Sequence, residues 1–246
     1  MSALAAVLFD MDGTLVDTEE LWWQVARDVA AGLGHDLTDA DAPEVVGRAV
    51  EDTAAHLARI TGGDDTERVA AALGNAFFRR VDAGAPLRPG VQRLLSELEH
   101  EGVPFALVSA SPRTVVDSVT RGSLAHVPFA FTLSADDTVR TKPHPDPYRA
   151  AAERFGAAPA VCVAVEDSPD GAASAEAAGC PLLVVPSLLP VPPSPRRTFA
   201  ESLDGIGAAD LLRCVEAGRR NRDFDGSQFS GSGPQLAPRP STGIAP

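Results

Sequence analysis

Two carboxylates stand one residue apart near the start of the chain, at Asp10 and Asp12, directly after the apolar run at residues 4–9. Such a run is typical of a fully buried strand, and Gly13 allows a sharp turn after it. Two acids this close in a partly dry site need a cation or a shared proton, although an ordinary turn uses the same residue types. A calcium loop does not fit, because Leu21 stands where that loop needs a bidentate glutamate.

Further polar residues stand at or after the later strands that the apolar runs predict. Ser109 ends the second of these strands, and Lys142 lies in a loop ahead of a predicted helix. Glu166 and Asp167 directly follow the fourth strand. Taken singly, a serine or an aspartate here is an ordinary helix cap, and a loop lysine is ordinarily solvated. Because the carboxyl ends of parallel strands meet at one edge of a sheet, we expect all these side chains to converge with the first pair of acids.

These residue types suit the transfer of a phosphoryl group. A carboxylate can attack phosphorus and form an aspartyl-phosphate, and a second carboxylate can protonate the leaving oxygen and later deprotonate the attacking water. Mg2+ prefers oxygen ligands and neutralises a cluster of acids. Ser109 and the N–H groups of a helix opening at Pro112 can hold phosphate oxygens, while Lys142 supplies positive charge. The sequence therefore predicts a magnesium-dependent phosphoryl-transfer site.

Strands alternate with helices along most of the chain, which is typical of an α/β fold with a doubly wound parallel sheet. The predicted strands are residues 4–9, 103–109, 129–133, 161–165 and 182–185. After the first strand, a long stretch has helical periodicity and no convincing strand. Its first helix is predicted to be capped by Asp17, and two more are predicted over 51–60 and 65–82. The proline-dense stretch at 186–195 is predicted to be irregular.

This alternation predicts one core domain that a helical domain interrupts. The predicted boundaries are residues 1–16 and 85–217 for the core, 17–84 for the helical insertion and 218–246 for a disordered tail. The tail is rich in Gly, Ser, Pro and Arg and poor in large apolar residues, which favours disorder. The core helices are predicted between Pro89 and Gly102, from Pro112, and over 146–155, 169–179 and 206–215.

Composition restricts the partners that we expect. The 246 residues hold 21 Lys and Arg against 34 Asp and Glu, for a formal net charge of −13. A chain this acidic is not expected to bind nucleic acid or an anionic membrane. Without a basic N-terminal region or a long apolar run, no signal peptide or membrane span is expected. The three cysteines have no metal-ligand spacing, and Cys162 is expected to be a buried inert thiol. We therefore expect a cytoplasmic protein, either a monomer or a weak homodimer.

Four ordered motifs resemble those of the haloacid dehalogenase-like superfamily of phosphohydrolases. They are Asp10-Met11-Asp12-Gly13-Thr14, Ser109, Lys142-Pro143 and Glu166-Asp167-Ser168. The resemblance covers about residues 4–190 and implies that Asp10 is the nucleophile and Asp12 the general acid and base. It also implies that Ser109, Ala110 and Lys142 bind phosphate.

The same resemblance implies a metal site and a mobile cap. Magnesium would be held by Asp10, the backbone carbonyl of Asp12, and Asp167, with Glu166 as a further contributor. The helical insertion resembles the family's cap, which closes over the site and excludes water. Within it, Gly47-Arg48 resembles the segment that places an arginine on the substrate, although Arg48 is also interpretable as an exposed cation.

The run from Lys142 to Pro147 resembles the branch that contains phosphoglycolate phosphatase-like and β-phosphoglucomutase-like enzymes. The mutases of that branch carry a histidine where this chain has Trp22. They also carry a Lys-Asn pair where this chain has Pro112 and Arg113. Both departures favour a phosphatase. Arg113 is a candidate for binding a second anionic group of the substrate, and a surface role fits it equally.

The sequence thus predicts a magnesium-dependent phosphatase that acts on a small phosphorylated metabolite, of the sugar phosphate or phosphoglycolate type, through an aspartyl-phosphate. Two alternatives stay open. The chain could be a sugar-phosphate mutase of the same fold, or a catalytically silent sensor of a phosphorylated ligand. Release of halide is disfavoured, because a second carboxylate and a magnesium site have no use in that reaction.

Overall fold

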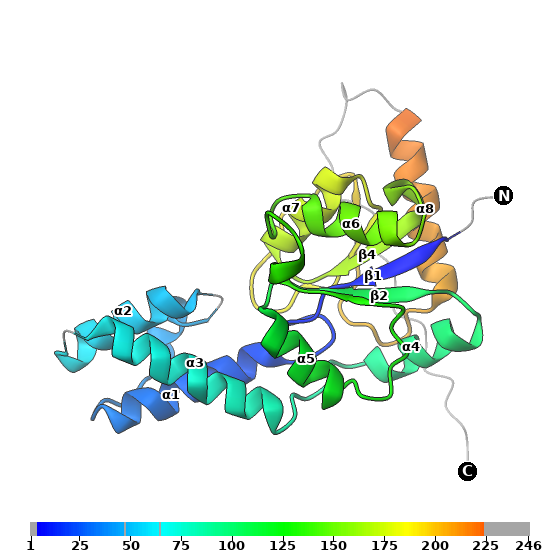
Figure 1. The fold of residues 1–246 in the computed structure, drawn as a ribbon. Helices are drawn as coiled ribbons and strands as arrows, with labels where there is room; N and C mark the ends of the chain where they lie inside the picture. The colour runs from blue at the N-terminus through cyan, green and yellow to red at the C-terminus, as the bar shows by residue number, and fades with distance from the viewer. Residues whose placement is uncertain (1–3, 47, 64, 224–246) are drawn as a thin grey trace, which may run out of the picture. The chain divides into compact units, whose positions relative to one another are not determined.

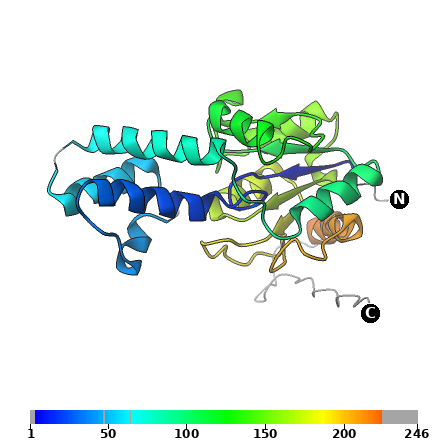
Figure 2. The same ribbon diagram turned by 90° about the horizontal axis from the view of Figure 1, so that it is seen from below.

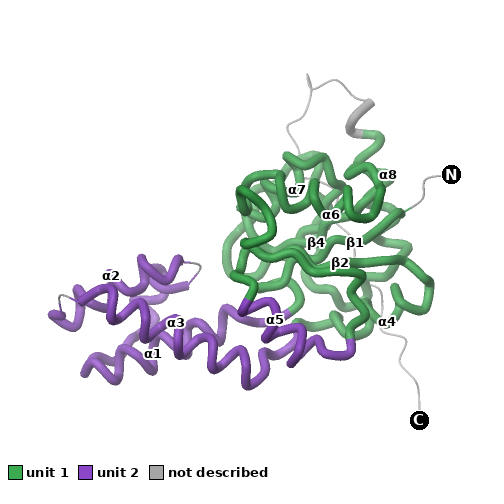
Figure 3. Tube along the Cα trace, viewed as in Figure 1, with its two compact units in different colours: residues 1–15, 88–113, 127–246 green, residues 16–87, 114–126 purple. Residues whose placement is uncertain are grey.

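The computed structural model describes residues 4–46, 48–63 and 65–223, and Figures 1 and 2 show its ribbon from two directions. The chain divides into two compact units, which Figure 3 distinguishes by colour. Unit 1 comprises residues 1–15, 88–113 and 127–246, and unit 2 comprises residues 16–87 and 114–126.

Unit 1 is built around one parallel sheet with the strand order β3-β2-β1-β4-β5-β6. Its strands are β1 (Ala6–Phe9), β2 (Phe105–Val108), β3 (Thr132–Leu133), β4 (Cys162–Glu166), β5 (Leu182–Val184) and β6 (Arg197–Phe199). The first strand lies in the middle, since Leu8 is in register with Ala106 on one side and Ala164 on the other. The predicted parallel sheet is confirmed. The short edge strand β6 was not predicted.

Helices cover both faces of this sheet (Figures 1 and 2). The helices are α4 (Val91–His100), α6 (Asp146–Arg154), α7 (Pro169–Ala178) and α8 (Ala208–Asp223), with short 3-10 turns at Ala135–Asp137 (η2) and Pro159–Val161 (η3). Side chains alternate between the faces of a strand. Ala6 and Leu8 therefore face α6 and α7, in a core with Tyr148 and Ala172. Packing on both faces explains why all four residues of β1 are buried.

Unit 2 contains α1 (Thr18–Gly32), η1 (Asp39–Glu44), α2 (Val50–Thr61) and α3 (Thr66–Asp82). The predicted N-cap of α1 is confirmed, because the Asp17 carboxylate accepts a hydrogen bond from the backbone N–H of Glu20. Within the described part of 17–84 there is no strand. The helices pack through an apolar core that includes Val25, Leu57 and Leu73. The helical character predicted for this stretch is therefore confirmed.

Unit 2 also includes a segment that lies far from residues 17–84 in the sequence. Residues 114–126, which hold most of α5 (Arg113–Arg121), belong to unit 2. One reason is a pair of hydrogen bonds within that unit. The Ser118 hydroxyl donates to Asp82 at 2.8 Å, and the Ser123 hydroxyl donates to the Ala85 carbonyl at 2.5 Å. The predicted domain boundaries at 17 and 84 stay a prediction.

Helix α8 corrects the expected start of the tail. The helix continues to Asp223, so disorder from residue 218 is wrong for residues 218–223. The rest of the proposed tail, 224–246, lies outside the described residues. The stretch 186–195 has no helix or strand, as its prolines predicted.

The cysteines and the helices bear on two further expectations. Cys162 is a buried free thiol, and burial raises its pKa to about 11, which agrees with an inert role. Among the helices that the structure describes, none combines the length and the apolar character that crossing a bilayer requires.

Candidate active site

The carboxyl edge of the sheet in unit 1 gathers the predicted site residues. Asp10 follows β1 directly, Ser109 follows β2, and Asp167 follows β4, whose last residue is Glu166. Lys142 reaches them from the loop before α6. The strand order places β1 between β2 and β4, so the three strand ends are neighbours at this edge. The predicted convergence of these residues is therefore seen in the structure.

Lys142 lies between two of the carboxylates. Its ammonium donates a hydrogen bond of 2.5 Å to Oδ1 of Asp10 and one of 2.6 Å to Oε1 of Glu166. Only 4% of the lysine side chain is exposed. Desolvation opposes the charged form, but Asp10 and Glu166 outweigh it and hold the pKa of Lys142 above its ordinary value. Lys142 is therefore a fixed positive charge beside Asp10.

Tyr148 on α6 contacts both Glu166 and Lys142. Its hydroxyl donates a hydrogen bond of 2.5 Å to Oε1 of Glu166. Its ring lies 5.2 Å from the Lys142 ammonium, within the range of a cation–π contact. Burial, and then the charges of Glu166 and Asp10, raise the pKa of Tyr148 well above its ordinary value, so the hydroxyl keeps its proton. No sequence pattern indicated a role for Tyr148, although it directly follows the Lys142–Pro147 run.

Asp10 and Asp12 have different surroundings. Burial raises the pKa of Asp10; the attraction of Lys142 opposes this shift, and the charge of Asp12 adds to it. Asp12 is held by two hydroxyls, since its Oδ2 accepts from Ser109 Oγ at 3.2 Å and from Ser111 Oγ at 2.7 Å. One acid is thus paired with an ammonium and the other with neutral donors.

Ser111 is a second residue of the site that no sequence pattern indicated. Its backbone N–H donates to Ser109 Oγ at 2.9 Å, so the two serines form one turn after β2. Ala110 lies between them and is exposed. A second hydroxyl two residues after Ser109 was the available signal, but many loops contain such a pair.

Three buried acids form a group that fits a metal ion. Oxygen atoms of Asp10, Glu166 and Asp167 all lie within 4.8 Å of one another. Burial raises the pKa of Glu166; the attraction of Lys142 opposes this shift, and the charge of Asp10 adds to it. Three carboxylates are a hard oxygen donor set, which suits Mg2+ or a similar cation. Asp12 turns its side chain toward the serines, so only its backbone carbonyl stays in the predicted ligand set.

The two predicted arginines are engaged elsewhere. The Arg113 guanidinium donates to Thr132 Oγ1 at 2.7 Å and also to Asp137, so it lies against β3 and η2. Arg48 belongs to unit 2, where its Nε donates to the carbonyl of Pro43 at 3.0 Å. Gly47, which accompanied Arg48 in the sequence motif, lies outside the described residues. Substrate contacts by either arginine stay a prediction.

The site is thus a group of buried acids and one lysine at the carboxyl edge of a parallel sheet. Residues 4–179 match a family model described as haloacid dehalogenase-like hydrolase, and the chain belongs to that family. Hexitol phosphatase B of Escherichia coli (strain K12) is similar to this chain, with 31% identity over 216 residues, which are 85% of this chain and 97% of that protein. The chain is therefore an enzyme of the hydrolase class, as the sequence predicted.

Solved structures show the same similarity. The crystal structure of CbbY from Rhodobacter sphaeroides in complex with phosphate has a TM-score of 0.68 and 27% identity. It covers 85% of this chain and 99% of the CbbY chain. A CbbY variant from the same organism, in complex with xylulose-(1,5)bisphosphate, has a TM-score of 0.66 and 25% identity over the same shares.

Proposed function

We propose that this protein is a magnesium-dependent phosphatase that hydrolyses a small phosphorylated metabolite through an aspartyl-phosphate on Asp10. The observation that carries the proposal is the difference between the two acids at the end of β1. Asp10 contacts the Lys142 ammonium at 2.5 Å, whereas Asp12 accepts hydrogen bonds from serine hydroxyls. Two neighbouring carboxyl groups with different surroundings are suited to different catalytic roles.

Asp10 is the nucleophile in this proposal. A carboxylate must approach a phosphate that is itself an anion, and the fixed charge of Lys142 reduces that repulsion. The lysine also stabilises the negative charge on the oxygens of the phosphoryl group during transfer. Attack by Oδ2 of Asp10 would form a new P–O bond while the bond to the leaving oxygen breaks.

Asp12 is the general acid and base. Its proton would pass to the leaving alcohol, and its carboxylate would then remove a proton from the water that hydrolyses the acyl phosphate. Ser109 and Ser111 hold Oδ2 of Asp12 before substrate binds. Because hydroxyls both donate and accept, they can hold this carboxyl in either protonation state.

The acids Asp10, Glu166 and Asp167, with the Asp12 carbonyl, would hold the magnesium ion. When bound, Mg2+ neutralises the acid cluster and polarises a phosphate oxygen. Lys142 and Tyr148 occupy Oε1 of Glu166 with hydrogen bonds. This contact gives Glu166 a second role, which is to hold the lysine in place.

Two relatives that the chain resembles support a substrate class. One is named hexitol phosphatase B, and another was crystallised with xylulose-(1,5)bisphosphate. We therefore propose a sugar or polyol phosphate, with phosphoglycolate as a smaller candidate. In this proposal unit 2 is the cap, and Arg48 contacts the substrate. A cytoplasmic location and a monomeric or weakly dimeric state accompany the proposal.

Two observations favour a phosphatase over a mutase. Trp22 stands where the mutases carry a histidine, and its indole N–H donates to the Val45 carbonyl at 3.0 Å while its ring packs on Phe77. An indole has no proton to exchange at neutral pH. Arg113 is held by Thr132 and Asp137 within unit 1. Pro112 and Arg113 thus stand in place of the Lys-Asn pair of the mutases, and the arginine already has partners within this chain.

The test is phosphate release from a panel of hexitol phosphates, pentulose bisphosphates and phosphoglycolate with Mg2+. The full-length chain should release phosphate, and Asp10→Asn should lose at least about 10³-fold in kcat while keeping its fold. Incubation with a hexose 1-phosphate that gave isomerised sugar phosphate without free phosphate would establish the mutase. Binding without turnover across the panel would establish the sensor.

A further inference from the structure

We infer that Ser187, in the proline-dense loop after β5, is a positioning residue that sets the orientation of the Asp167 carboxylate for its cation. This inference rests on the proposed magnesium site and adds a residue to it. Neither the motifs nor the composition of the loop indicated such a role, because residues 186–195 have no regular structure.

Both oxygens of the Asp167 carboxylate receive a hydroxyl. Thr14 Oγ1 donates to Oδ1 at 3.2 Å, and Ser187 Oγ donates to Oδ2. Asp167 is 3% exposed, so water is largely excluded as a substitute donor. Two donors on opposite oxygens fix the rotation of a carboxylate group, which a single donor does not.

Gly13 leaves the space that this arrangement needs. A Cβ at position 13 would lie 2.1 Å from Oδ2 of Asp167 and 3.0 Å from Oγ of Ser187. The same oxygen and hydroxyl therefore fill the volume above the turn that follows β1. The loop after β5 therefore packs against the turn that follows β1, and its Ser187 contacts a residue of the acid group directly.

A carboxylate held by outer hydrogen bonds binds a metal more tightly, since it loses less rotational freedom on binding. Each hydroxyl donates its hydrogen to one lone pair of a carboxylate oxygen, and that oxygen keeps a second lone pair. The Ser187 contact therefore orients Asp167 without blocking it. Loss of the hydroxyl should weaken cation binding much more than it slows the chemical step.

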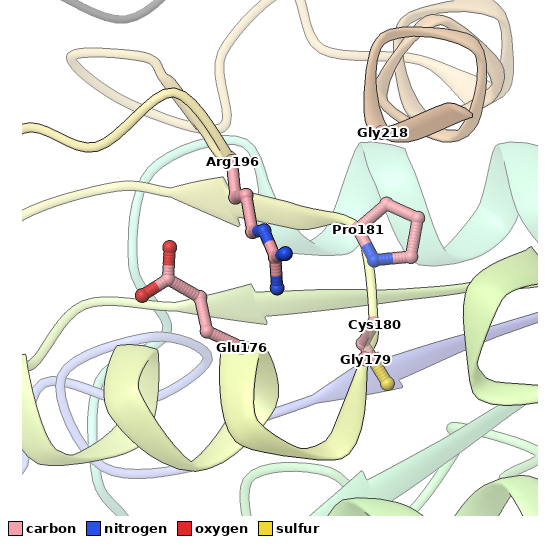
Figure 4. A pocket seen from close by; sticks show the side chains of 6 residues that line it. All are labelled: Glu176, Gly179, Cys180, Pro181, Arg196 and Gly218. Atoms are coloured by element: carbon pink, nitrogen blue, oxygen red, sulfur yellow. The ribbon is translucent and has the colours of Figure 1, made fainter. Parts of the chain in front are cut away.

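The experiment compares Ser187→Ala, Ser187→Thr and Ser194→Ala in the full-length chain. Ser194 is the matched control, because it lies in the same loop and its hydroxyl donates to a carboxylate at 2.8 Å, that of Glu176. Glu176 lines a separate pocket of about 50 Å³ beside Arg196 (Figure 4). That volume is far below the roughly 300 Å³ of a small-molecule site, so no substrate is expected to bind beside Glu176.

Binding of Mg2+ alone is measured by titration calorimetry, and the Mg2+ dependence of kcat is measured separately. Ser187→Ala should raise the Mg2+ dissociation constant about tenfold, with kcat at saturating Mg2+ changed less than about threefold. Ser187→Thr should restore wild-type binding, and Ser194→Ala should match the wild type.

Equal Mg2+ affinity in Ser187→Ala and the wild type would overturn the inference and leave the proposed function intact. So would a lower melting temperature without any change in affinity, because that result marks a purely structural serine. If the wild-type chain binds no Mg2+, both the magnesium-dependent function and the inference are wrong.

Discussion

The Tyr148 hydroxyl and Oε1 of Glu166 are 2.5 Å apart, and both side chains are fully buried. The same oxygen accepts the ammonium of Lys142 at 2.6 Å. Tyr148 and Lys142 thus donate to the same oxygen of Glu166, and Lys142 also donates to Asp10. The neutral phenol is essential to this arrangement, since a phenolate would add a third negative charge beside Glu166 and Asp10.

Tyr148 is the single tyrosine of the chain, so its ionisation can be followed by ultraviolet absorbance. Its raised pKa means that the folded protein should show no tyrosinate at about pH 10, where free tyrosine is half ionised. Above that pH the unfolded state releases a proton that the folded state keeps, so stability falls as pH rises. Tyrosinate should appear only together with the loss of circular dichroism. A gradual titration in the folded protein at about pH 10 would contradict the buried hydrogen bond.

Replacing Lys142 by methionine should destabilise the fold in a pH-dependent way. The change leaves Asp10 and Glu166 buried without their ammonium, at a cost of about 3–5 kcal/mol near pH 8. Both carboxyl groups already have raised pKa values that Lys142 opposes, and without it they rise further. The folded state then binds protons that the unfolded state does not, so the variant gains stability as pH falls through these values.

Denaturation in urea from about pH 8 to about pH 5, without Mg2+, measures this effect. Arg140→Met is the control, because Arg140 forms an exposed pair with Asp146 in the same loop. The hydrogen bond from Arg140 lowers the pKa of Asp146 below its ordinary value. Any stability that this ion pair contributes is therefore lost only at more acid pH. If the free energy of unfolding of Lys142→Met does not approach the wild-type value as pH falls, the two carboxylates have other partners in the variant.

Gly171 near the start of α7 should resist replacement by alanine although alanine favours helices. Its Cβ would lie 1.9 Å from Oε2 of Glu166, whose other oxygen is held by Lys142 and Tyr148. The helical gain of about 1 kcal/mol should therefore be exceeded by a packing cost of about 1–3 kcal/mol.

Gly74 in α3 is the matched control for this substitution, since nothing lies within 4 Å of its added Cβ. Gly74→Ala should stabilise the chain by about 0.5–1 kcal/mol. Urea denaturation of both variants gives the comparison. If Gly171→Ala is also stabilised, Glu166 is able to move, and its role as a fixed support for Lys142 is wrong.

The sheet and its acids were predictable because their signals are local. The apolar run before Asp10 marks β1, and Asp17 caps α1 where the sequence indicated. Pro169 opens α7 and Gly179 ends it with a left-handed φ of 92°. Topology then follows from the alternation of strands and helices, and it brings the strand ends together.

The residues that hold the reactive groups were not predictable in the same way. Ser111, Tyr148 and Ser187 are ordinary residues whose roles arise from contacts between segments far apart in the chain. The edge strand β6 was missed because it has only three residues and follows a proline-dense stretch. Single side chains and short edges carry no periodicity, so a pattern cannot identify them.

The central position of β1 also affects how this protein emerges from the ribosome. Its four apolar residues are made first, but β2 begins only at Phe105 and β4 at Cys162. During synthesis, on the order of ten seconds pass before Asp167 follows Asp10 out of the ribosome. Until Phe105–Val108 emerges, Ala6–Phe9 has no partner within its own sheet, and helices of the insertion can already form locally. Ala6–Phe9 is therefore the strand of the described sheet that waits longest for a partner, and Asp10 follows it directly.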